Sequence, residues 1–474
     1  MSFLHSTRAR TLGVLLSVAL VIILLLLAIS FAEVFMIVPP WTVRAAAHDD
    51  PPGLAGESLA GSVYAVAANG TDVYVAGEFT SIGNVSAKNL AKWNRSSGVW
   101  SSLGDGVNGV VHAIAISGSD VYVGGNFTAA INPGGSSVAV YSIARWTGSS
   151  WAALGAAAAN GNGVNGDVAA IAINGSNIYV TGEFNIARNS ASASVSANGV
   201  VRWNGSAWSA LGSGSGATGN GVSSPGHYYI YAIAVNGNDV YVGGSFTKAY
   251  NNNGSEISAN CVARWNSATN TWAALGTGNG PGTNGVNGDV LAIAVNGSDI
   301  YVAGAFTSTY NSSSAQINSQ HIARWNGSAW SALGSGTSAG GNGVNSSVTS
   351  LAVSNGVVYV GGEFDTAYNG TGGGVNTDCI ARWNGSAWSA VGDGMDSSVF
   401  ALAANGADLF AGGDFTVARN SNGSVNASNV ARWNGTQWAA FSAGSTTGGT
   451  VFDGTVLCSS QTSICIGVLW RVIM

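Results

Sequence analysis

Three tyrosines and two arginines recur at one position of a repeated unit and are the strongest candidates for binding a ligand. Tyr250, Tyr310 and Tyr368 each precede an asparagine, and Arg188 and Arg419 occupy the same position in the flanking units. Tyrosine offers a large contact area at low conformational entropy cost, and guanidinium groups donate charged hydrogen bonds. This set predicts a surface for sugar rings or an extended peptide. The alternative is that each tyrosine packs under its own loop.

Acidic residues form a second, weaker candidate. They lie in the loops between repeats and comprise Asp105, Asp167, Asp289, Asp393 and Asp396. Such loops offer oxygen ligands of the kind that Ca²⁺ takes, but they lack an EF-hand pattern. Paired acids such as Asp167 with Asp289 are also the minimum for a glycosidase. The histidines show no metal-ligand spacing, so we expect no metal site, no cofactor and no catalytic residue.

Pairs of tryptophans define the repeated unit, and this unit must position the candidate tyrosines, arginines and aspartates. Fourteen of the 16 tryptophans fall into seven pairs, and the first members of successive pairs lie 50 to 62 residues apart. Self-similarity at such a period indicates an array of supersecondary units. The pairs are Trp93/Trp100, Trp146/Trp151, Trp203/Trp208, Trp265/Trp272, Trp325/Trp330, Trp383/Trp388 and Trp433/Trp438.

Each unit contains four short β-prone segments (A to D) separated by turn residues. In the fourth unit these segments lie at about residues 231–235, 240–246, 261–266 and 272–276. Asn-Gly pairs such as Asn236-Gly237 predict tight hairpins, with both residues at the centre of the turn. Seven such units predict an all-β, seven-bladed β-propeller of four-stranded antiparallel blades. We expect alanines to line the crowded axis and the tryptophans to fill the gaps near the rim.

The loop lengths distinguish two faces of the predicted propeller. The A–B and C–D hairpins are short, whereas the B–C and D–A loops are long and variable, and these two sets lie on opposite sides. Because binding residues concentrate on such loops, we expect the B–C and D–A face to meet a partner. A unique D–A insertion adds His227 and Tyr228 to the candidate residues, near the mouth of the axial channel. The basic residue before each first tryptophan is expected to stack on indole or pair with a carboxylate.

The repeats resemble the kelch motif. The shared features are Gly-Gly at the end of the second segment, an aromatic residue in the third and a final Trp-x-x-Leu. The pattern of residues 121–128 followed by 143–146 is closer still to repeats of the fungal cortical polarity-marker family, and bacterial surface proteins carry similar arrays. The resemblance covers about residues 63–441. It implies a propeller fold but little about chemistry, because such propellers serve as adhesins, scaffolds, lectins and enzymes.

The N-terminus carries an export signal. Arg8 and Arg10 precede an uncharged run at residues 12–32, which is long enough for a hydrophobic helix to span a bilayer. Flanking positive charge predicts that the propeller lies outside the cell. A small-residue motif ending at Ala47 offers a cleavage site. Residues 1–47 are therefore either a cleaved signal or an anchor, and the protein is expected to be secreted or held at the cell surface by one membrane span.

The remaining boundaries follow from the repeat. Residues 48–62 are expected to be a linker, 63–441 the propeller, and 442–474 a degenerate tail that resembles a decayed eighth repeat. Cys261 and Cys379 lie two blades apart and are not expected to form a disulfide bond. Without the N-terminal segment the chain keeps 13 basic and 21 acidic residues, a formal net charge of −8. Nucleic acid is therefore not an expected partner.

Three functions stay open from the sequence. The first is a non-enzymatic recognition or adhesion module for a cell-surface protein or glycan. The second is a structural cell-envelope protein without a specific ligand. The third is a carbohydrate-active enzyme at the axial mouth.

Overall fold

The computed structural model describes residues 59–155, 162–190, 192–212, 220–223, 229–251, 255–278, 283–312, 315–336, 341–370 and 373–441. The chain divides into two compact units, Met1–Leu54 and Ala55–Met474, and all of these residues belong to the second. The predicted N-terminal helix, the cleavage site near Ala47 and the tail at 442–474 lie outside them. Within these ranges, no helix has the length and apolar character needed to cross a membrane.

The described part of the chain has an all-β, propeller-like fold. It forms seven antiparallel sheets, each with four strands along its main path. In the first four sheets these strands are β1 (Leu59–Asn69), β2 (Asp72–Ile82), β4 (Leu90–Asn94) and β5 (Val99–Ser102); β6 (Val110–Ser117), β7 (Asp120–Asn126), β10 (Ile143–Trp146) and β11 (Trp151–Ala152); β13 (Asp167–Asn174), β14 (Asn177–Glu183), β17 (Val200–Trp203) and β18 (Trp208–Ala210); and β20 (Tyr229–Asn236), β21 (Asp239–Ser245), β24 (Val262–Asn266) and β25 (Thr271–Ala274). In the last three they are β27 (Val290–Asn296), β28 (Asp299–Gly304), β31 (Ile322–Trp325) and β32 (Trp330–Ala332); β33 (Val348–Ser354), β34 (Val357–Gly362), β37 (Ile380–Trp383) and β38 (Trp388–Ala390); and β39 (Val399–Asn405), β40 (Asp408–Gly413), β43 (Val430–Trp433) and β44 (Trp438–Ala440).

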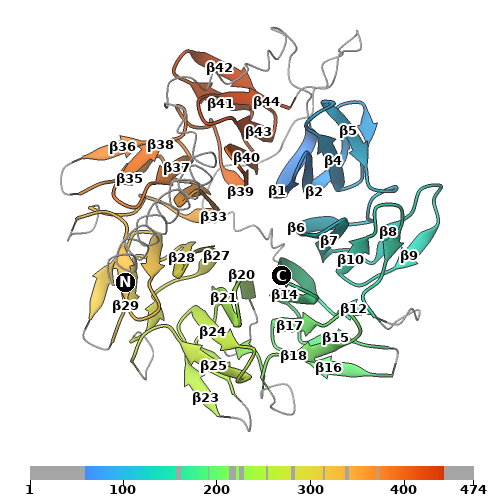
Figure 1. The fold of residues 1–474 in the computed structure, drawn as a ribbon, viewed down its shortest axis with the longest axis horizontal. Helices are drawn as coiled ribbons and strands as arrows, with labels where there is room; N and C mark the ends of the chain where they lie inside the picture. The colour runs from blue at the N-terminus through green and yellow to red at the C-terminus, as the bar shows by residue number, and fades with distance from the viewer. Residues whose placement is uncertain are drawn as a thin grey trace, which may run out of the picture. The chain divides into compact units, whose positions relative to one another are not determined.

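The sheets follow one another around a ring with their first strands innermost (Figure 1). Each inner strand contacts the next inner strand, and β39 of the last sheet contacts β1 of the first. The four main-path strands of each sheet come from one continuous segment of the chain, so no strand is exchanged between the first and last described sheets. Strand β1 begins at Leu59, so the last four residues of the predicted linker belong to the first sheet.

Short additional strands lie between the second and third strands of each sheet. In six sheets they form a two-stranded hairpin, which we call the B–C hairpin, and in the first sheet a single short strand pairs with β2. The additional strands are β3 (Val85–Ser86), β8 (Ala129–Ile131), β9 (Ser137–Ala139), β15 (Ile186–Arg188), β16 (Ser194–Ser196), β22 (Lys248–Tyr250), β23 (Glu256–Ser258), β29 (Ser308–Tyr310), β30 (Gln316–Asn318), β35 (Thr366–Tyr368), β36 (Gly374–Asn376), β41 (Val417–Asn420) and β42 (Gly423–Asn426). In the connections between sheets, β12 (Gly163–Val164), β19 (Val222–Ser223) and β26 (Gly285–Val286) pair with β15, β22 and β29.

The hairpins between first and second strands differ from the prediction at their centre. Asn236 pairs with Asp239, so the two loop residues are Gly237 and Asn238, and Gly237 takes a φ of 59°. The asparagine instead links blades, because its Nδ2 donates to the carbonyl of Gly297 in the next hairpin at 2.9 Å. Only at Asn355-Gly356 do both residues have positive φ, as predicted.

The tryptophan pairs lie between neighbouring sheets, and all but the partly buried Trp146 are buried. At each of the six joints between consecutive sheets, the indole of the second tryptophan donates to a backbone carbonyl in the last strand region of the preceding sheet. The pairs are Trp151 to Leu103, Trp208 to Leu154, Trp272 to Leu211, Trp330 to Leu275, Trp388 to Leu333 and Trp438 to Val391, at 2.9–3.1 Å. Indole therefore supplies both buried area and a directional bond at each joint.

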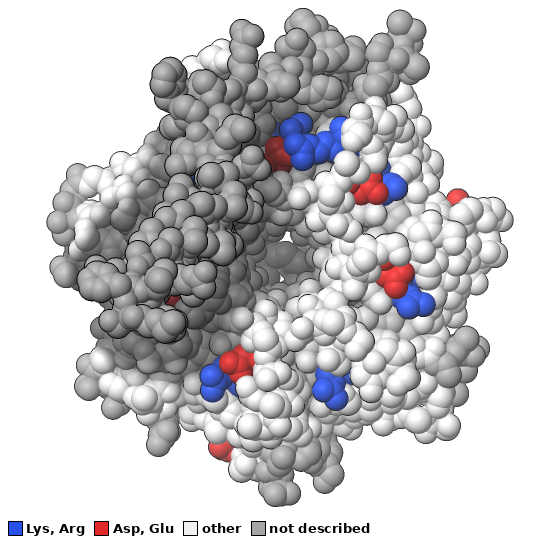
Figure 2. Space-filling model, in the orientation of Figure 1, with Lys and Arg blue, Asp and Glu red and all other residues white. Residues whose placement is uncertain are grey.

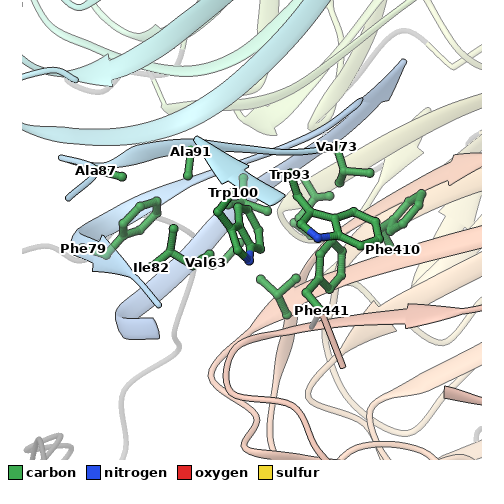
Figure 3. Packing of buried hydrophobic residues seen from close by; sticks show 14 residues of the cluster. Val63, Val73, Phe79, Ile82, Ala87, Ala91, Trp93, Trp100, Phe410 and Phe441 are labelled. Carbon is green, nitrogen blue, oxygen red and sulfur yellow. The ribbon is translucent and has the colours of Figure 1, made fainter. Parts of the chain in front are cut away.

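The seam between the last and first sheets uses different contacts (Figure 3). Phe441 packs on Trp93 and Trp100, with ring centroids 4.6 and 5.5 Å apart. Trp100 Nε1 is buried without a hydrogen-bond partner among the residues that the structure describes. Asp408, which is 4% exposed, forms ion pairs with Arg95 of the first sheet and Arg432 of its own sheet. An aromatic stack and a shared carboxylate thus close the ring.

Candidate functional site

The predicted tyrosines end the outgoing strands of three neighbouring B–C hairpins. Tyr250, Tyr310 and Tyr368 pair directly with Glu256, Gln316 and Gly374 of the returning strands. All three tyrosines are half-buried. The ring of Tyr368 lies beside Gly374, so this tyrosine partly covers its own hairpin while keeping an exposed edge.

The backbone at this position has a structural role that is the same in six blades. A glycine with positive φ follows the last strand region of each preceding sheet and approaches the carbonyl of the hairpin residue so closely that a Cβ has little or no room. These contacts are Gly104 to Ile131, Gly155 to Arg188, Gly212 to Tyr250, Gly276 to Tyr310, Gly334 to Tyr368 and Gly392 to Arg419. The joint therefore constrains the backbone here and leaves the side chain to vary.

The asparagine after each tyrosine belongs to the scaffold rather than to the binding surface. Asn311 Oδ1 accepts a hydrogen bond from the backbone N–H of Trp330 at 2.6 Å, and its Nδ2 donates to the carbonyl of Trp330. The same pair of bonds joins Asn189 to Trp208, Asn251 to Trp272, Asn369 to Trp388 and Asn420 to Trp438. Asn251, Asn311 and Asn369 thus fix the hairpins that present the tyrosines.

The two predicted arginines differ in their surroundings. Arg419 Nη1 forms an ion pair with Asp378 at 3.0 Å and donates to the carbonyl of Met395. This side chain ties its hairpin to the preceding blade, so its charge is largely compensated. Arg188 is half-buried at the end of β15. His227 and Tyr228 lie outside the described residues.

The opposite face carries the basic residues that precede the first tryptophans. Five of them pair with an aspartate of the hairpin between first and second strands, as predicted: Lys92–Asp72, Arg145–Asp120, Arg264–Asp239, Arg324–Asp299 and Arg432–Asp408. Figure 2 shows one face of the ring, where blue and red side chains lie mostly in adjacent pairs around a central hollow. Paired charges of this kind offer little to a ligand.

At the axis lies a set of residues that the sequence motifs do not predict. In each of the seven innermost strands the register shifts at one equivalent residue, which forms a β-bulge. We call these residues the bulge ring: Tyr64, His112, Ala169, Tyr231, Leu291, Thr349 and Phe400. When the repeats are aligned, this position varies within an otherwise apolar strand, and that variation is the sequence signal that could have identified the ring.

The acidic residue Asp167 lies beside this ring, and its carboxylate is 3.2 Å from His112 Nδ1. Asp289 lies near Tyr231. The pKa of the Tyr231 phenol is raised above its ordinary range, mainly by burial and then by the negative charge of Asp289. Asp167 is the first residue of the inner strand β13, and Asp289 immediately precedes the inner strand β27. Asp396 instead caps its own B–C hairpin by accepting hydrogen bonds from Thr416 and Val417.

Metal and thiol chemistry have no support in the described ranges. No group of three or more His, Cys, Asp or Glu side chains there is arranged to hold a metal ion. Cys261 and Cys379 are free thiols at equivalent strand starts. Burial raises the pKa of Cys261 to about 12 and that of Cys379 to about 11, so neither is a reactive thiolate at neutral pH.

Comparison with known families supports the class of fold. Residues 42–223 match the family model of the Rax2 C-terminal beta propeller domain. This match spans less than half of the 474 residues and includes the first three four-stranded sheets. It supports a β-propeller in this chain. Kelch-like character and the particular family stay predictions, and none of the curated proteins matches the chain.

Solved structures with a similar arrangement are distant in sequence. The computationally designed Ika8 protein is 14% identical, with 80% of this chain and 98% of that chain covered and a TM-score of 0.43. The WD40 beta propeller domain of Doa1 is 11% identical over 76% and 94%, with a TM-score of 0.41. A chain of the Mitotic Checkpoint Complex is 14% identical over 80% and 93%, with a TM-score of 0.42. At these scores the likeness carries no argument about function.

Proposed function

We propose that this chain is an exported, seven-bladed β-propeller that serves as a non-enzymatic scaffold at the cell surface. It binds a protein partner through the face formed by its B–C hairpins and D–A connections. A rigid ring presents side chains to the partner, and binding involves no turnover. The N-terminal hydrophobic run directs export and, when uncleaved, anchors the ring to the membrane.

One observation carries the proposal: the backbone of the B–C hairpins is held in the same way in six blades while the exposed side chains differ. The glycine contact holds each hairpin against the preceding sheet, and the Asn–Trp bonds hold it to the last strand of its own sheet. Side chains on such a fixed frame lose little entropy when they bind. Three adjacent hairpins present tyrosine, which is enriched at interfaces because it combines an apolar ring with a polar tip.

The charge distribution favours a partner on this face over the other. On the opposite face, the basic residues form ion pairs with aspartates of the same blade. An interface core is depleted in charge and enriched in aromatic residues. The three tyrosines fit that composition, and the paired charges do not.

The test compares the full chain, purified in mild detergent, with the Tyr250→Ala/Tyr310→Ala/Tyr368→Ala variant on an array of cell-surface proteins and glycans. We expect the native chain to bind a protein probe and the triple variant to lose at least tenfold in affinity. Each truncation leaves the backbone contacts in place, because the tyrosine position meets the joint through its backbone carbonyl and N–H groups rather than through its side chain.

A matched control truncates three exposed side chains on the other face. Ser206, Ser328 and Ser386 cap the C–D turns, and changing them to alanine is expected to leave binding unchanged. Equal binding by the native chain and the tyrosine variant would exclude the tyrosines as the binding surface. Binding to glycans alone would redirect the proposal to a lectin, and cleavage of a glycan would overturn the non-enzymatic assignment.

A further inference from the structure

The bulge ring is an inner-strand position whose chemistry varies from blade to blade. The residue before each bulge is always an aliphatic one, and it is almost fully buried between sheets: Val63, Val111, Val168, Ile230, Val290, Val348 and Val399. The bulged residues themselves are all partly exposed. A bulge re-aims a side chain without breaking the sheet, so the scaffold is constant and its inward side chains are free to change.

These side chains meet across blades at the axis. The ring of Tyr64 lies 5.7 Å from His112 in an edge contact and 6.1 Å from Phe400, which joins three consecutive blades. In the fourth blade, Tyr231 stacks on Tyr229 with centroids 6.3 Å apart and an interplanar angle of 7°. Aromatic faces and edges therefore line two parts of the axial wall.

Carboxylates surround this wall on the B–C and D–A side. The residue two positions before each bulge lies opposite a residue at the end of the second strand, to which it is joined by strand pairing or by a backbone hydrogen bond. These mouth positions are Ser62 and Glu78, Val110 and Asn126, Asp167 and Glu183, Tyr229 and Ser245, Asp289 and Ala305, Ser347 and Glu363, and Ser398 and Asp414. Six of the fourteen residues are acidic, and none is lysine or arginine.

The acidic groups are close enough to the aromatic wall to act with it. Glu183 and Asp289 both act electrostatically on Tyr231. Burial raises the pKa of Glu363 above its ordinary range, which places that carboxyl in a partly dehydrated setting. His112 is the only basic side chain in the bulge ring, and Asp167 pairs with it.

We propose that the axial mouth binds the side chain of a lysine or arginine residue on the protein partner. The cation lies in the axial mouth, which the aromatic side chains of Tyr64, Phe400 and Tyr231 and the surrounding carboxylates line from different blades. An aromatic face attracts a cation through its quadrupole, and carboxylates add charge complementarity in a partly dehydrated site. This inference rests on the proposed function, since the mouth opens on the same face as the hairpin tyrosines.

The chemistry of the site distinguishes this ligand from others. Among the fourteen described mouth positions an anion meets six acidic residues and no arginine or lysine, so the charge of the mouth disfavours phosphate and sulfate as ligands. A neutral sugar gains from the aromatic faces but not from the acidic rim. A cationic side chain uses both, and the planar guanidinium of arginine also stacks on aromatic rings.

Isothermal titration of the full chain with three peptides tests the proposal. The probes are acetyl-Gly-Arg-Gly-amide, its lysine analogue and its citrulline analogue, which keeps the shape of arginine without the charge. We expect the two cationic peptides to bind at least tenfold more tightly than the citrulline peptide. Equal binding of all three peptides, or no heat from any of them, would overturn the proposal.

Two variants locate the binding. Tyr64→Ala and Asp289→Asn are each expected to weaken the arginine peptide at least fivefold. Tyr64→Phe keeps the aromatic face, and its affinity for the arginine peptide is expected to stay within twofold of that of the native chain. Together with Asp289→Asn it replaces the alanine variant if that variant does not fold. If Tyr64→Ala folds and binds as tightly as the native chain, the axial assignment is wrong.

The two proposals fail separately. The triple tyrosine variant of the B–C hairpins is expected to bind the arginine peptide as the native chain does. If the triple variant loses array binding and the native chain does not bind the arginine peptide, the hairpin surface remains supported and the axial site is excluded. Peptide binding that survives while the array shows no partner would retain the axial site and exclude the hairpin surface.

Discussion

The six joints within the repeat and the seam that closes the ring achieve the same packing by different chemistry. Within the repeat, each joint has an indole bonded to a carbonyl of the preceding sheet. At the seam the corresponding indole, Trp100, stacks on Phe441 and has no hydrogen-bond partner among the described residues. The seam instead has Asp408 with two arginines and a bond from Ser62 to Asp414 at 2.7 Å.

The comparison shows how a propeller-like ring closes without exchanging a strand. The link between hairpins persists at the seam, because Asn405 Nδ2 donates to the carbonyl of Gly70 at 2.7 Å as its counterparts do elsewhere. What changes is the rim. There Arg95 supplies a charged contact to Asp408 of the last sheet.

The largest expected effect is the loss of an indole within the repeat. Trp330→Ala removes about 150–250 Å² of buried contact and is expected to cost about 3–5 kcal/mol in the free energy of unfolding. Chemical denaturation followed by circular dichroism measures this cost. The control is Val99→Ala, because Val99 is 52% exposed and is expected to change stability by less than about 0.5 kcal/mol. Equal effects of the two substitutions would refute the packing role of the indoles.

The next effect tests the charge at the seam. Asp408→Asn keeps the shape but removes the charge that Arg95 and Arg432 share, and we expect a loss of about 3 kcal/mol because the carboxylate is buried. Asp299→Asn is the matched change within the repeat. Asp299 is 27% exposed and 3.4 Å from Arg324, so its loss is expected to cost less than about 1 kcal/mol. A smaller effect at Asp408 than at Asp299 would mean that aromatic packing alone closes the ring.

A third prediction concerns the asparagine that fixes each B–C hairpin. Asn311→Ala leaves the backbone N–H of Trp330 without its acceptor, which is expected to cost about 2 kcal/mol. The first sheet has no such hairpin, and its exposed Asn84 gives the control, with no measurable change on substitution to alanine. The measurement is again the midpoint of chemical denaturation. An unchanged midpoint for Asn311→Ala would contradict the hairpin link.

A smaller effect isolates the indole hydrogen bond itself. Trp330→Phe and Trp100→Phe both keep an aromatic ring and remove one N–H group. Only Trp330 loses a described bond, to the carbonyl of Leu275 at 3.0 Å, so its substitution is expected to cost about 1 kcal/mol more. Paired thermal or chemical melts give this difference directly. Equal losses would show that the bond adds nothing beyond ring packing.

The sequence predicts the repeat because period, turn residues and tryptophans all reflect packing that recurs in every blade. It predicts that the basic residues either stack on indole or pair with a carboxylate, and the structure identifies the carboxylates as aspartates of the hairpins between first and second strands. It misplaces turns such as Asn236-Gly237 by one residue, because the asparagine side chain there bonds to the neighbouring blade rather than lying in its own turn. Contacts between blades depend on the ring, which local spacing does not encode.

The candidate site was predicted less completely than the fold. The three tyrosines do occupy one equivalent place on neighbouring hairpins, but Arg419 is bound to Asp378 of the preceding blade. That contact joins residues 41 positions apart, and nothing in their local sequence indicates it. The bulge ring was missed because a bulge reverses the expected facing of one residue in an otherwise apolar strand.

The smallest expected effect concerns the residue at the start of the third strand, which differs between a blade within the repeat and the two blades that form the seam. His321, Asn89 and Asn429 occupy equivalent strand starts with φ of 62°, 65° and 65°. His321 Nδ1 lies 3.1 Å from the carbonyl of Gly304, where Asn429 Nδ2 donates to Gly413 at 2.8 Å. Burial lowers the pKa of His321, although the bond to Gly304 partly offsets the shift.

Because the folded pKa of His321 is below the unfolded value of about 6.5, the unfolded state binds more protons near that pH. The contribution of His321 to stability is therefore fully present above pH 6.5 and is lost as the pH falls below that value through the lower pKa of the folded state. In His321→Asn the side chain makes the same bond without titrating. Unfolding curves from pH 7.5 to 5.5 should therefore show a shallower loss of stability in the variant than in the native chain, and parallel curves would exclude His321 as a source of acid sensitivity.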